Sequence, residues 1–493
     1  MQESKERQKT PISKKIQENE HELKSRLGIG VSFDVGVRKL HVLKKEVQIY
    51  YCTGLCDSLF IIEIMRELMD MDHGHRAPSN VKEILHDHLS HQQVELTDNL
   101  EIAIDRMLSG LISVFLEGED QAFIVDVRSY PGRQPEEPDI EKVVRGSRDG
   151  YTENIIINTA LTRRRIRDER LRHEIMQVGK RSKTDICISY IEDIADPGLV
   201  DLVKKELQSI DIDGIPMADK TIEEFLVKQG WDPFPLVRYT ERPDVAAQHL
   251  MEGHVLVITD TSPSVIITPT TYFHHVQHAE EFRQTPMVGA FIRWVRFAGI
   301  IGSLILVPLW YLYASQEGLL PPDIDFIGPN KTTHIPLFLQ IVFAEIGIEI
   351  LRVAAIHTPS PLSTAMGLIA AVLIGQIAID VGLFVPEVIL YVSVAAIGGF
   401  STPSYELSVA NKMLRLLLLV LTAIFHVPGL VGGATLLLLY LAFVKNLNTP
   451  YLWPFIPFNA KAFVQIMIRL AVPLSKVRPS IVHPQNSKKQ PTS

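Results

Sequence analysis

Cysteine is scarce in this sequence, with three cysteines in 493 residues. They are Cys52, Cys56 and Cys187, and the first two have a C-x3-C spacing instead of the C-x2-C spacing of common redox and zinc motifs. A disulfide framework is therefore excluded, and we expect three reduced thiols in a part of the chain that faces a cytosol. The first 26 residues are polar and lack the apolar core of a signal peptide, so we expect no cleaved signal.

Charged residues are sparse in one long region of the chain. Residues 297–450 contain eight acidic and five basic side chains, although charged residues make up 22% of the whole sequence. Neither a single soluble domain nor a disordered chain has so uneven a distribution. About 290 residues precede this region, which is enough for two domains, so a protein embedded in the membrane throughout is also excluded.

Net charge differs between the two ends of the chain. The formal charge is −8 in total, about −3 of it in residues 297–450, and residues 451–493 hold six basic residues and no acidic one. About −11 is left for the N-terminal region, which argues against nucleic acid as the partner. We expect the basic run Arg163, Arg164 and Arg165 to pair with acids of this region instead of binding phosphate.

Motifs of nucleotide binding and hydrolysis are missing. The run RGSRDG lacks the lysine and the strand context of a phosphate-binding loop, and no nucleophile elbow occurs. We therefore expect neither an enzyme nor a cofactor. Histidines gather in two groups without an HExxH motif or a nearby cysteine, and we favour a solvated surface over a metal site. The groups are His73, His75, His86, His88 and His91, and His274, His275 and His278.

The apolar periodicity predicts an α/β cytoplasmic head of two subdomains, followed by an α-helical multi-pass membrane domain. A long basic helix is expected over residues 152–176, and no internal repeat of fixed period is visible. The predicted segments are a polar N-terminal segment (1–27), a first α/β subdomain (28–130), a linker with the RGSRDG turn (131–150), a second α/β subdomain (151–286), the membrane domain (287–450) and a basic cytoplasmic tail (451–493).

Six apolar stretches are candidate membrane segments. The last two, 413–425 and 431–444, are short for a full span, so they form either a tight hairpin or broken half-helices. Arginines flank the start of the first stretch and the loop 314–336 is acidic on balance, which places the head inside and this loop outside. The basic tail should be inside, so we expect four or six crossings. The other four stretches are 287–313, 337–356, 365–384 and 388–400.

Three charged residues interrupt the stretch 337–356. Glu345, Glu349 and Arg352 have the spacing i, i+4, i+7, which puts them on one face of a helix. Charges inside a membrane normally face a protein interior or a water-filled cavity. They could line an ion path or its gate, form an ion pair that locks two helices together, or face water at the interface.

Two further polar residues, Gln376 and Asp380, lie one helical turn apart in an otherwise apolar stretch. In an oligomer, Asp380 could form a carboxylate ring that selects cations; the alternative is a solvated position near the end of the helix. Gly367, Ala371 and Gly375 recur every four residues, a pattern of small residues that lets another helix approach closely.

The run EPDIEKVVRGSRDGYTENIIINTALTRRRIRDER, residues 137–170, closely resembles the signature of the spore-germination receptor A-subunit family (GerA type). Three more runs resemble the same family, so the resemblance covers nearly the whole chain: FHHVQHAEEFRQTPMVGAFIRWVRFAGI (273–300), SPLSTAMGLIAAVLIGQIAIDVGLFVPEVI (360–389) and TPYLWPFIP (449–457). The residues carried over by the match are Arg145, Gly146, Arg148, Gly150 and Glu153 in the head, and Gly375, Gln376 and Asp380 in the membrane core.

This resemblance implies a protein of the spore inner membrane whose relatives are viewed as oligomeric, channel-like transducers, with germinant binding assigned to a different subunit. We therefore expect a homo-oligomeric ion channel or channel-like transducer that promotes ion release during germination, with other germination proteins and the lipid bilayer as partners. Both termini should face the spore core. The alternative is a non-conducting membrane scaffold that assembles other germination proteins or supports dipicolinic acid movement.

Overall fold

A computed structural model describes residues 10–42, 44–70, 94–131, 141, 143, 145–316, 318–319, 327–330, 333–357, 367 and 375–489. The chain forms two compact units. The first comprises Met1–Gly230, Val237–Pro269 and Val472–Ser493, and the second comprises Trp231–Leu236 and Thr270–Ala471.

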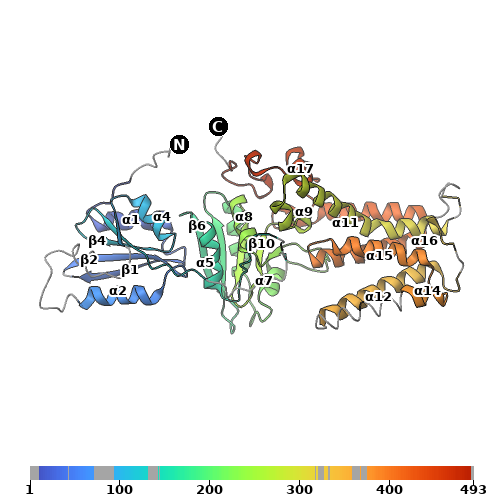
Figure 1. The fold of residues 1–493 in the computed structure, drawn as a ribbon, viewed down its shortest axis with the longest axis horizontal. Coiled ribbons are helices and arrows are strands. Elements are labelled where there is room, and N and C mark those ends of the chain that lie inside the picture. Colours follow the sequence, from blue (N-terminus) through green and yellow to red (C-terminus); the bar gives the residue numbers. More distant parts are fainter. Residues whose placement is uncertain are drawn as a thin grey trace. The chain divides into compact units, whose positions relative to one another are not determined.

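The first subdomain of the first unit is a five-stranded sheet covered by helices on both faces. Its strands are all antiparallel and lie in the order β1-β2-β4-β5-β3. Helices α1 and α4 pack on one face and α2 on the other (Figure 1). The elements are α1 (Ile16–Leu27), β1 (Val35–Val42), β2 (Lys45–Cys52), α2 (Ser58–Asp70), β3 (Val94–Thr97), α4 (Leu100–Met107), β4 (Ile112–Leu116) and β5 (Ala122–Val125).

The second subdomain repeats the topology of the first. Its antiparallel strands lie in the order β6-β7-β9-β10-β8, so each strand takes the place of its counterpart five numbers earlier. Helices α5 and α8 pack on one face, as α1 and α4 do in the first subdomain, and α7 contacts β9 and β10. The elements are α5 (Ile155–Arg165), β6 (Leu171–Val178), β7 (Thr184–Ile191), α6 (Pro197–Gln208), α7 (Ala218–Leu226), β8 (Arg238–Thr240), α8 (Pro243–Glu252), β9 (Val255–Thr259) and β10 (Val265–Thr268).

The helix predicted over residues 152–176 is wrong in its second half. The side chain of Asn154 accepts hydrogen bonds from the amides of Ile156 and Ile157 and begins α5, which ends at Arg165. The chain then becomes extended at Ile166 and forms β6, which pairs with β7 along all of its eight residues. Pairing with a neighbouring strand outweighs local helix preference here, because strand formation depends on such tertiary contacts.

A buried ion pair joins the two subdomains. The Nε of Arg163, on α5, lies 2.8 Å from the Oδ2 of Asp34, which precedes β1, and both side chains are almost completely buried. The other guanidinium nitrogens of Arg163 donate to the carbonyl oxygens of Asp168 and Leu171, each at 2.9 Å. Ser32 donates to Asp34 at 2.7 Å and accepts from the amide of His173 at 3.0 Å. Because a buried charge needs such partners, this cluster fixes how the subdomains meet.

The predicted basic tail divides between the two units. Residues 472–489 belong to the first unit, where Ile481 and Val482 are buried. There the Nε of Arg478 donates to the carbonyl oxygen of Met251 at 2.6 Å, and the side-chain amide of Gln485 donates to that of Ala195 at 2.6 Å. The C-terminal part of the chain is thus a packed segment of the first unit.

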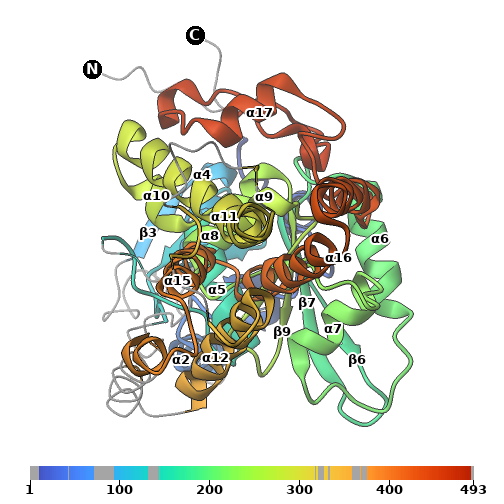
Figure 2. The same cartoon turned by 90° about the vertical axis from the view of Figure 1, so that its right-hand side faces the viewer.

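The second unit is mainly helical, and Figure 2 views several of its long helices nearly end-on. Within the part of the chain that the structure describes, two helices, α11 and α16, are long and apolar enough to cross a membrane, which indicates membrane association. The elements are α9 (Tyr272–Val276), α10 (Ala279–Arg283), α11 (Pro286–Ser315), α12 (Leu337–His357), α14 (Ala378–Asp380), α15 (Pro386–Phe400), α16 (Tyr405–Phe443), β11 (Lys445–Asn446), β12 (Thr449–Pro450) and α17 (Ala460–Met467).

Helix α16 folds back on itself in the middle. The backbone of His426 is non-helical, with φ 55° and ψ −131°, and Pro428 follows. A Cβ placed on Gly433 would lie 2.8 Å from Leu418, which is 15 positions earlier; in a straight helix this separation is about 22 Å. Of the two alternatives for 413–425 and 431–444, the tight hairpin is therefore the one observed, and Gly433 allows its two arms to meet.

Candidate functional site

The predicted polar face of α12 lies against a matching face of α16. Glu345, Glu349 and Arg352 are on one face of α12. The first arm of α16 carries Lys412 and Arg415, with Ser408 one turn earlier, so its polar residues have the same i, i+4, i+7 spacing. Two complementary polar strips therefore meet between these helices.

Ion pairs connect the two strips. The Nη2 of Arg415 lies 2.6 Å from the Oε2 of Glu345, and the Nζ of Lys412 lies 2.7 Å from the Oε2 of Glu349 and 3.7 Å from Glu345. Arg352 lies 3.1 Å from Glu349 and stacks over the ring of Tyr405. We call these five charged residues the α12–α16 charge cluster.

The cluster is also fixed to a third helix and holds an excess of positive charge. The Nη1 of Arg415 donates to the carbonyl oxygen of Ser303, on α11, at 2.7 Å. The side chains of Glu345 and Arg415 are 1% and 4% exposed. Three basic residues face two acidic ones, and one oxygen of Glu345 is buried without a hydrogen-bond partner among the described residues. Charged groups in an apolar environment are costly and mark functional positions.

An apolar groove opens beside the cluster. It has a volume of about 520 Å³ between α12 and α16. Glu345, Glu349 and Lys412 contribute to its lining, and the other lining side chains are apolar: Ile346, Ile350, Val353, Ala354, Val409, Met413 and Leu416. The cluster is therefore the polar part of an otherwise apolar depression.

The second pair of candidate residues lies apart from this cluster in the sequence. Gln376 and Asp380 are both exposed, and Asp380 is the last residue of the short helix α14. Gly367 and Gly375 are described, and beyond the adjoining backbone no atom of the described residues lies within 4 Å of a Cβ built on either. Ala371 lies outside the described residues. The close helix approach expected at these small residues stays a prediction.

The family motif in the head forms a turn that the second subdomain holds in place. Arg145 and Arg148 are exposed, and Gly146 has a φ of 147°, a region that favours glycine. Arg165 lies 2.6 Å from Asp149, and Arg242 donates to the carbonyl oxygen of Ser147 at 3.1 Å. The motif residues Gly150 and Glu153 follow; Gly150 is buried, and the carbonyl of Glu153 accepts from the amide of Thr261.

The basic run of α5 is used for internal contacts. Arg163 pairs with Asp34 and Arg165 with Asp149, so the predicted pairing with acids is confirmed for both. Arg164 instead lies over the ring of Tyr130, 4.6 Å from its centroid.

The histidines of the second group contribute to helix ends and to packing. His274 bonds to Thr271 at the start of α9, and His278 accepts from an amide at the start of α10. His275 is buried, so the predicted solvated surface is wrong for this residue. The first group lies outside the described residues.

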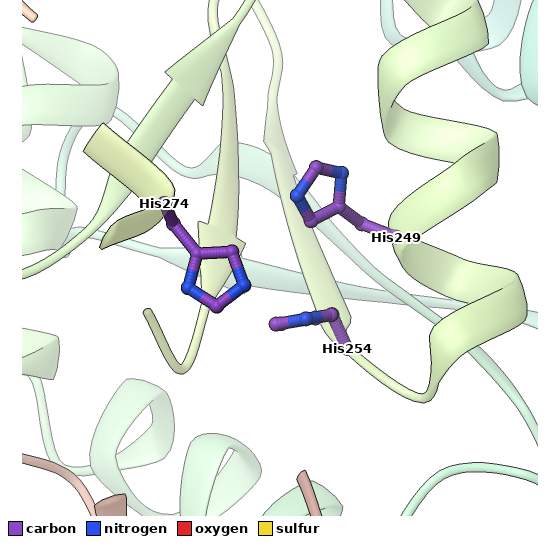
Figure 3. A group of neighbouring side chains, drawn as sticks. All are labelled: His249, His254 and His274. Carbon is purple, nitrogen blue, oxygen red and sulfur yellow. The ribbon is translucent and has the colours of Figure 1, made fainter. Parts of the chain in front are cut away.

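A histidine pair that the sequence analysis missed lies in the second subdomain. His249 on α8 and His254 before β9 pack edge to face, with ring centroids 5.0 Å apart; Figure 3 draws both, together with His274 of the other unit. The Nδ1 of His254 lies 2.9 Å from the carbonyl oxygen of Pro269. Burial lowers the pKa of each ring to about 3, so both are neutral near pH 7.

The sequence as a whole matches a known family over almost its full length. Residues 21–481 match the family described as the Bacillus/Clostridium GerA spore germination protein. The chain belongs to this family. It is therefore a spore germination protein.

Two relatives from Bacillus subtilis agree with this membership. Stage V sporulation protein AF of Bacillus subtilis (strain 168) is 63% identical over 475 residues, which cover 96% of each chain. Spore germination protein A1 of the same organism is 30% identical, covering 78% of this chain and 80% of the relative. The N-terminal domain of the A subunit of the Bacillus megaterium spore germinant receptor GerK3 is 26% identical, with a TM-score of 0.42, and covers 54% of this chain and 99% of that one.

Proposed function

We propose that the second unit forms a multi-pass, homo-oligomeric ion-conducting domain in the spore inner membrane, that the α/β head controls it, and that it promotes ion release during germination. No enzymatic step is part of this role. Other germination proteins are its partners, and both termini face the spore core.

The α12–α16 charge cluster carries this proposal. Charged groups on both helices recur every three to four residues beside an apolar groove, which is the arrangement expected of a polar path within a membrane domain. A group of buried charges rarely improves stability over well-packed apolar side chains, so their presence favours a role beyond packing. In the paired state the cluster closes the path between the helices, and separation of α12 from α16 would expose it to water.

The ion pairs of the α12–α16 charge cluster also favour a second function, that of a non-conducting scaffold. All five charged residues have ion-pair partners within the chain, and a membrane domain whose charges are paired internally suits a non-conducting scaffold. Such a scaffold would assemble other germination proteins or support dipicolinic acid movement. Ion flux through reconstituted protein separates the two functions.

The topology of this proposal is testable with an impermeant thiol reagent on intact cells. Single cysteines are placed at Asn330, in the loop expected outside, and at Ser487, in the tail expected inside. The three native cysteines are buried, so background labelling is low. We expect labelling at Asn330 and protection at Ser487, and the opposite pattern would contradict the proposed orientation.

Ion selectivity tests the proposed conduction at Asp380. In a symmetric oligomer each copy contributes one carboxylate, so the exposed Asp380 side chains together form a negative ring. Asp380→Asn should lower the preference for cations over anions, and Asp380→Lys should abolish or invert it, while assembly stays intact. Reversal potentials of protein in planar bilayers or liposomes measure this ratio.

The matched control is Glu387→Gln. Glu387 lies close by in the sequence and accepts a hydrogen bond from Asn330 at 2.8 Å, so its neutralisation removes one charge from the same region without touching Asp380. An unchanged permeability ratio in both Asp380 variants would eliminate this residue as a selectivity element. Absence of any flux from wild-type protein would favour the scaffold.

A further inference from the structure

The segment around α17 has exposed apolar side chains, whose contact with water is unfavourable. In residues 455–470, which we call the α17 segment, Phe458 is 68% exposed, and Phe455, Ile456, Val464 and Ile468 are also exposed. The opposite face of α17 is apolar too, since Ala462 and Ile466 are buried. A helix that is apolar on both faces needs an apolar environment on its outer face as well.

The α17 segment is fixed to the first turns of the candidate span α11. The Nη1 of Arg293 donates to the carbonyl oxygen of Ile466 at 2.7 Å, and the indole nitrogen of Trp294 donates to that of Met467 at 2.7 Å. Arg293 also pairs with the buried Glu281 at 2.7 Å. These contacts place α17 beside the beginning of α11.

The outer face of α11 is apolar from its first turn. Met287, Phe291 and Trp294 are exposed there, and the exposed Ile301 continues this face toward the middle of the helix. The arginines of the same turns, Arg293 and Arg296, are not part of this face, because both pair with Glu281 and Arg293 also donates to the carbonyl oxygen of Ile466. The apolar surface of the α17 segment is therefore continuous with a helix face that suits lipid.

The charge of the segment fits an anionic surface. Lys461 is exposed on α17 beside Val464, and Arg469 follows the helix. Residues 451–493 contain no acidic side chain. Exposed aromatic and aliphatic residues next to basic ones are typical of helices that lie in the plane of a membrane, and tryptophan is enriched at the same depth.

We propose that the α17 segment is an in-plane membrane anchor, with Phe458, Val464 and Ile468 inserted at the boundary of headgroups and acyl chains and Lys461 directed to anionic lipid headgroups. This inference rests on the membrane placement contained in the proposed function, but not on ion conduction. The anchor holds the N-terminal end of α11 at a fixed depth in the membrane. Displacement of α17 would therefore move this N-terminal end.

Fluorophores on single cysteines test this depth in the full-length protein reconstituted into phosphatidylcholine vesicles with and without phosphatidylglycerol. The positions are Phe458→Cys and Val464→Cys in the anchor, Ile301→Cys on the lipid face of α11, and Met217→Cys, an exposed apolar residue of the head. The buried native cysteines again give low background. One quencher is a nitroxide attached near the headgroup end of a lipid, and the other is aqueous iodide.

We expect iodide quenching at 458 and 464 to be roughly twofold or more below that at 217, with strong quenching by the shallow nitroxide lipid. Lys461→Glu should reduce nitroxide quenching at 464 in vesicles that contain phosphatidylglycerol, and Lys461→Arg should not. In vesicles of phosphatidylcholine alone, Lys461→Glu should have little effect.

Three outcomes would overturn the anchor. Iodide quenching at 458 and 464 equal to that at 217, with 301 shielded by lipid, would place the segment in water while leaving the membrane placement intact. Shielding of 458 and 464 from both quenchers would mean that another protein surface covers them. Iodide access at 301 as well would reject the membrane placement itself, and with it the proposed function.

Discussion

An Arg415→Met variant should lose a large part of the stability of the second unit. Among the described residues, the substitution leaves the carboxylate of Glu345, which is 1% exposed, with Lys412 at 3.7 Å as its remaining cationic partner. Removing one member of a buried ion pair costs about 3–5 kcal/mol, because the other charge stays buried. The apparent midpoint of thermal unfolding of the detergent-solubilised protein should fall accordingly.

Replacing both partners should restore most of this loss. In Glu345→Leu/Arg415→Met neither member of this pair is left alone, and buried pairs are often replaced by apolar residues at little cost. The matched control is Lys445→Met, which removes one exposed positive charge just beyond the end of α16 and should change stability by less than about 0.5 kcal/mol. If Arg415→Met is as stable as Lys445→Met, the Glu345–Arg415 pair does not hold α12 to α16.

The double variant also separates the two proposed functions. If the cluster is a gate, removing its central pair should raise ion leakage through reconstituted protein even though the fold is stable. If the cluster only locks helices in a scaffold, ion leakage through the double variant should be as low as through the wild type. Stability and flux are measured on the same preparation, so a folding defect is not mistaken for an open path.

The sequence predicts the polar strip of α12 but not its partners. Three charges at i, i+4 and i+7 define a helical face whatever surrounds it, so Glu345, Glu349 and Arg352 could be placed together. Ser408, Lys412 and Arg415 have the same spacing, so the sequence also carries a signal for a second polar helix face. Periodicity within one helix does not specify which other helix it packs against, so the pairing needed the structure.

The apolar spacing of the sequence predicts some of the strands and helices of the head but not all of them. This spacing predicts a strand over residues 111–116 and an amphipathic helix over 56–71. The structure has β4 and α2 at these positions. Residues 171–176 were misassigned because their strand depends on pairing with β7. The duplicated topology is not visible in the sequence, because the two subdomains share the order of their elements but not a pattern of similar residues at a fixed period.

An Arg163→Met variant should destabilise the head by about 3–5 kcal/mol at pH 7.5, and the loss should shrink at lower pH. In the wild type, burial would raise the pKa of the Asp34 carboxyl, but the charges of Arg163 and His173 and hydrogen bonds from Arg163 and Ser32 hold it at about 2. This lowered pKa contributes stability above the ordinary pKa of aspartate, about 4, and the contribution is lost as the pH falls through about 2.

Removing Arg163 reverses the sign of this dependence. Without the cation, burial should raise the pKa of Asp34 above its ordinary value, so the carboxyl takes up a proton as the pH falls and its penalty disappears. His173 should change in the same direction. Burial and the charge of Arg163 lower the pKa of its ring to about 4, against the opposing effect of Asp34, so in the variant its pKa should rise and the imidazolium can pair with Asp34.

Hydrogen exchange of peptides from β6 and β7 in the full-length protein, corrected for intrinsic rates, measures the free energy of opening at pH 7.5, 6.5 and 5.5. The Asp34→Asn/Arg163→Met double variant has no carboxylate at position 34, so its loss of opening free energy should be smaller at pH 7.5 and should not shrink through protonation of Asp34. Arg170→Met, which removes an arginine that is 47% exposed and pairs with Asp168, should cost less than about 1 kcal/mol. If the deficit of Arg163→Met is the same at all three pH values, Asp34 is not the charge that Arg163 neutralises, because a buried carboxylate left without its cation must respond to protonation.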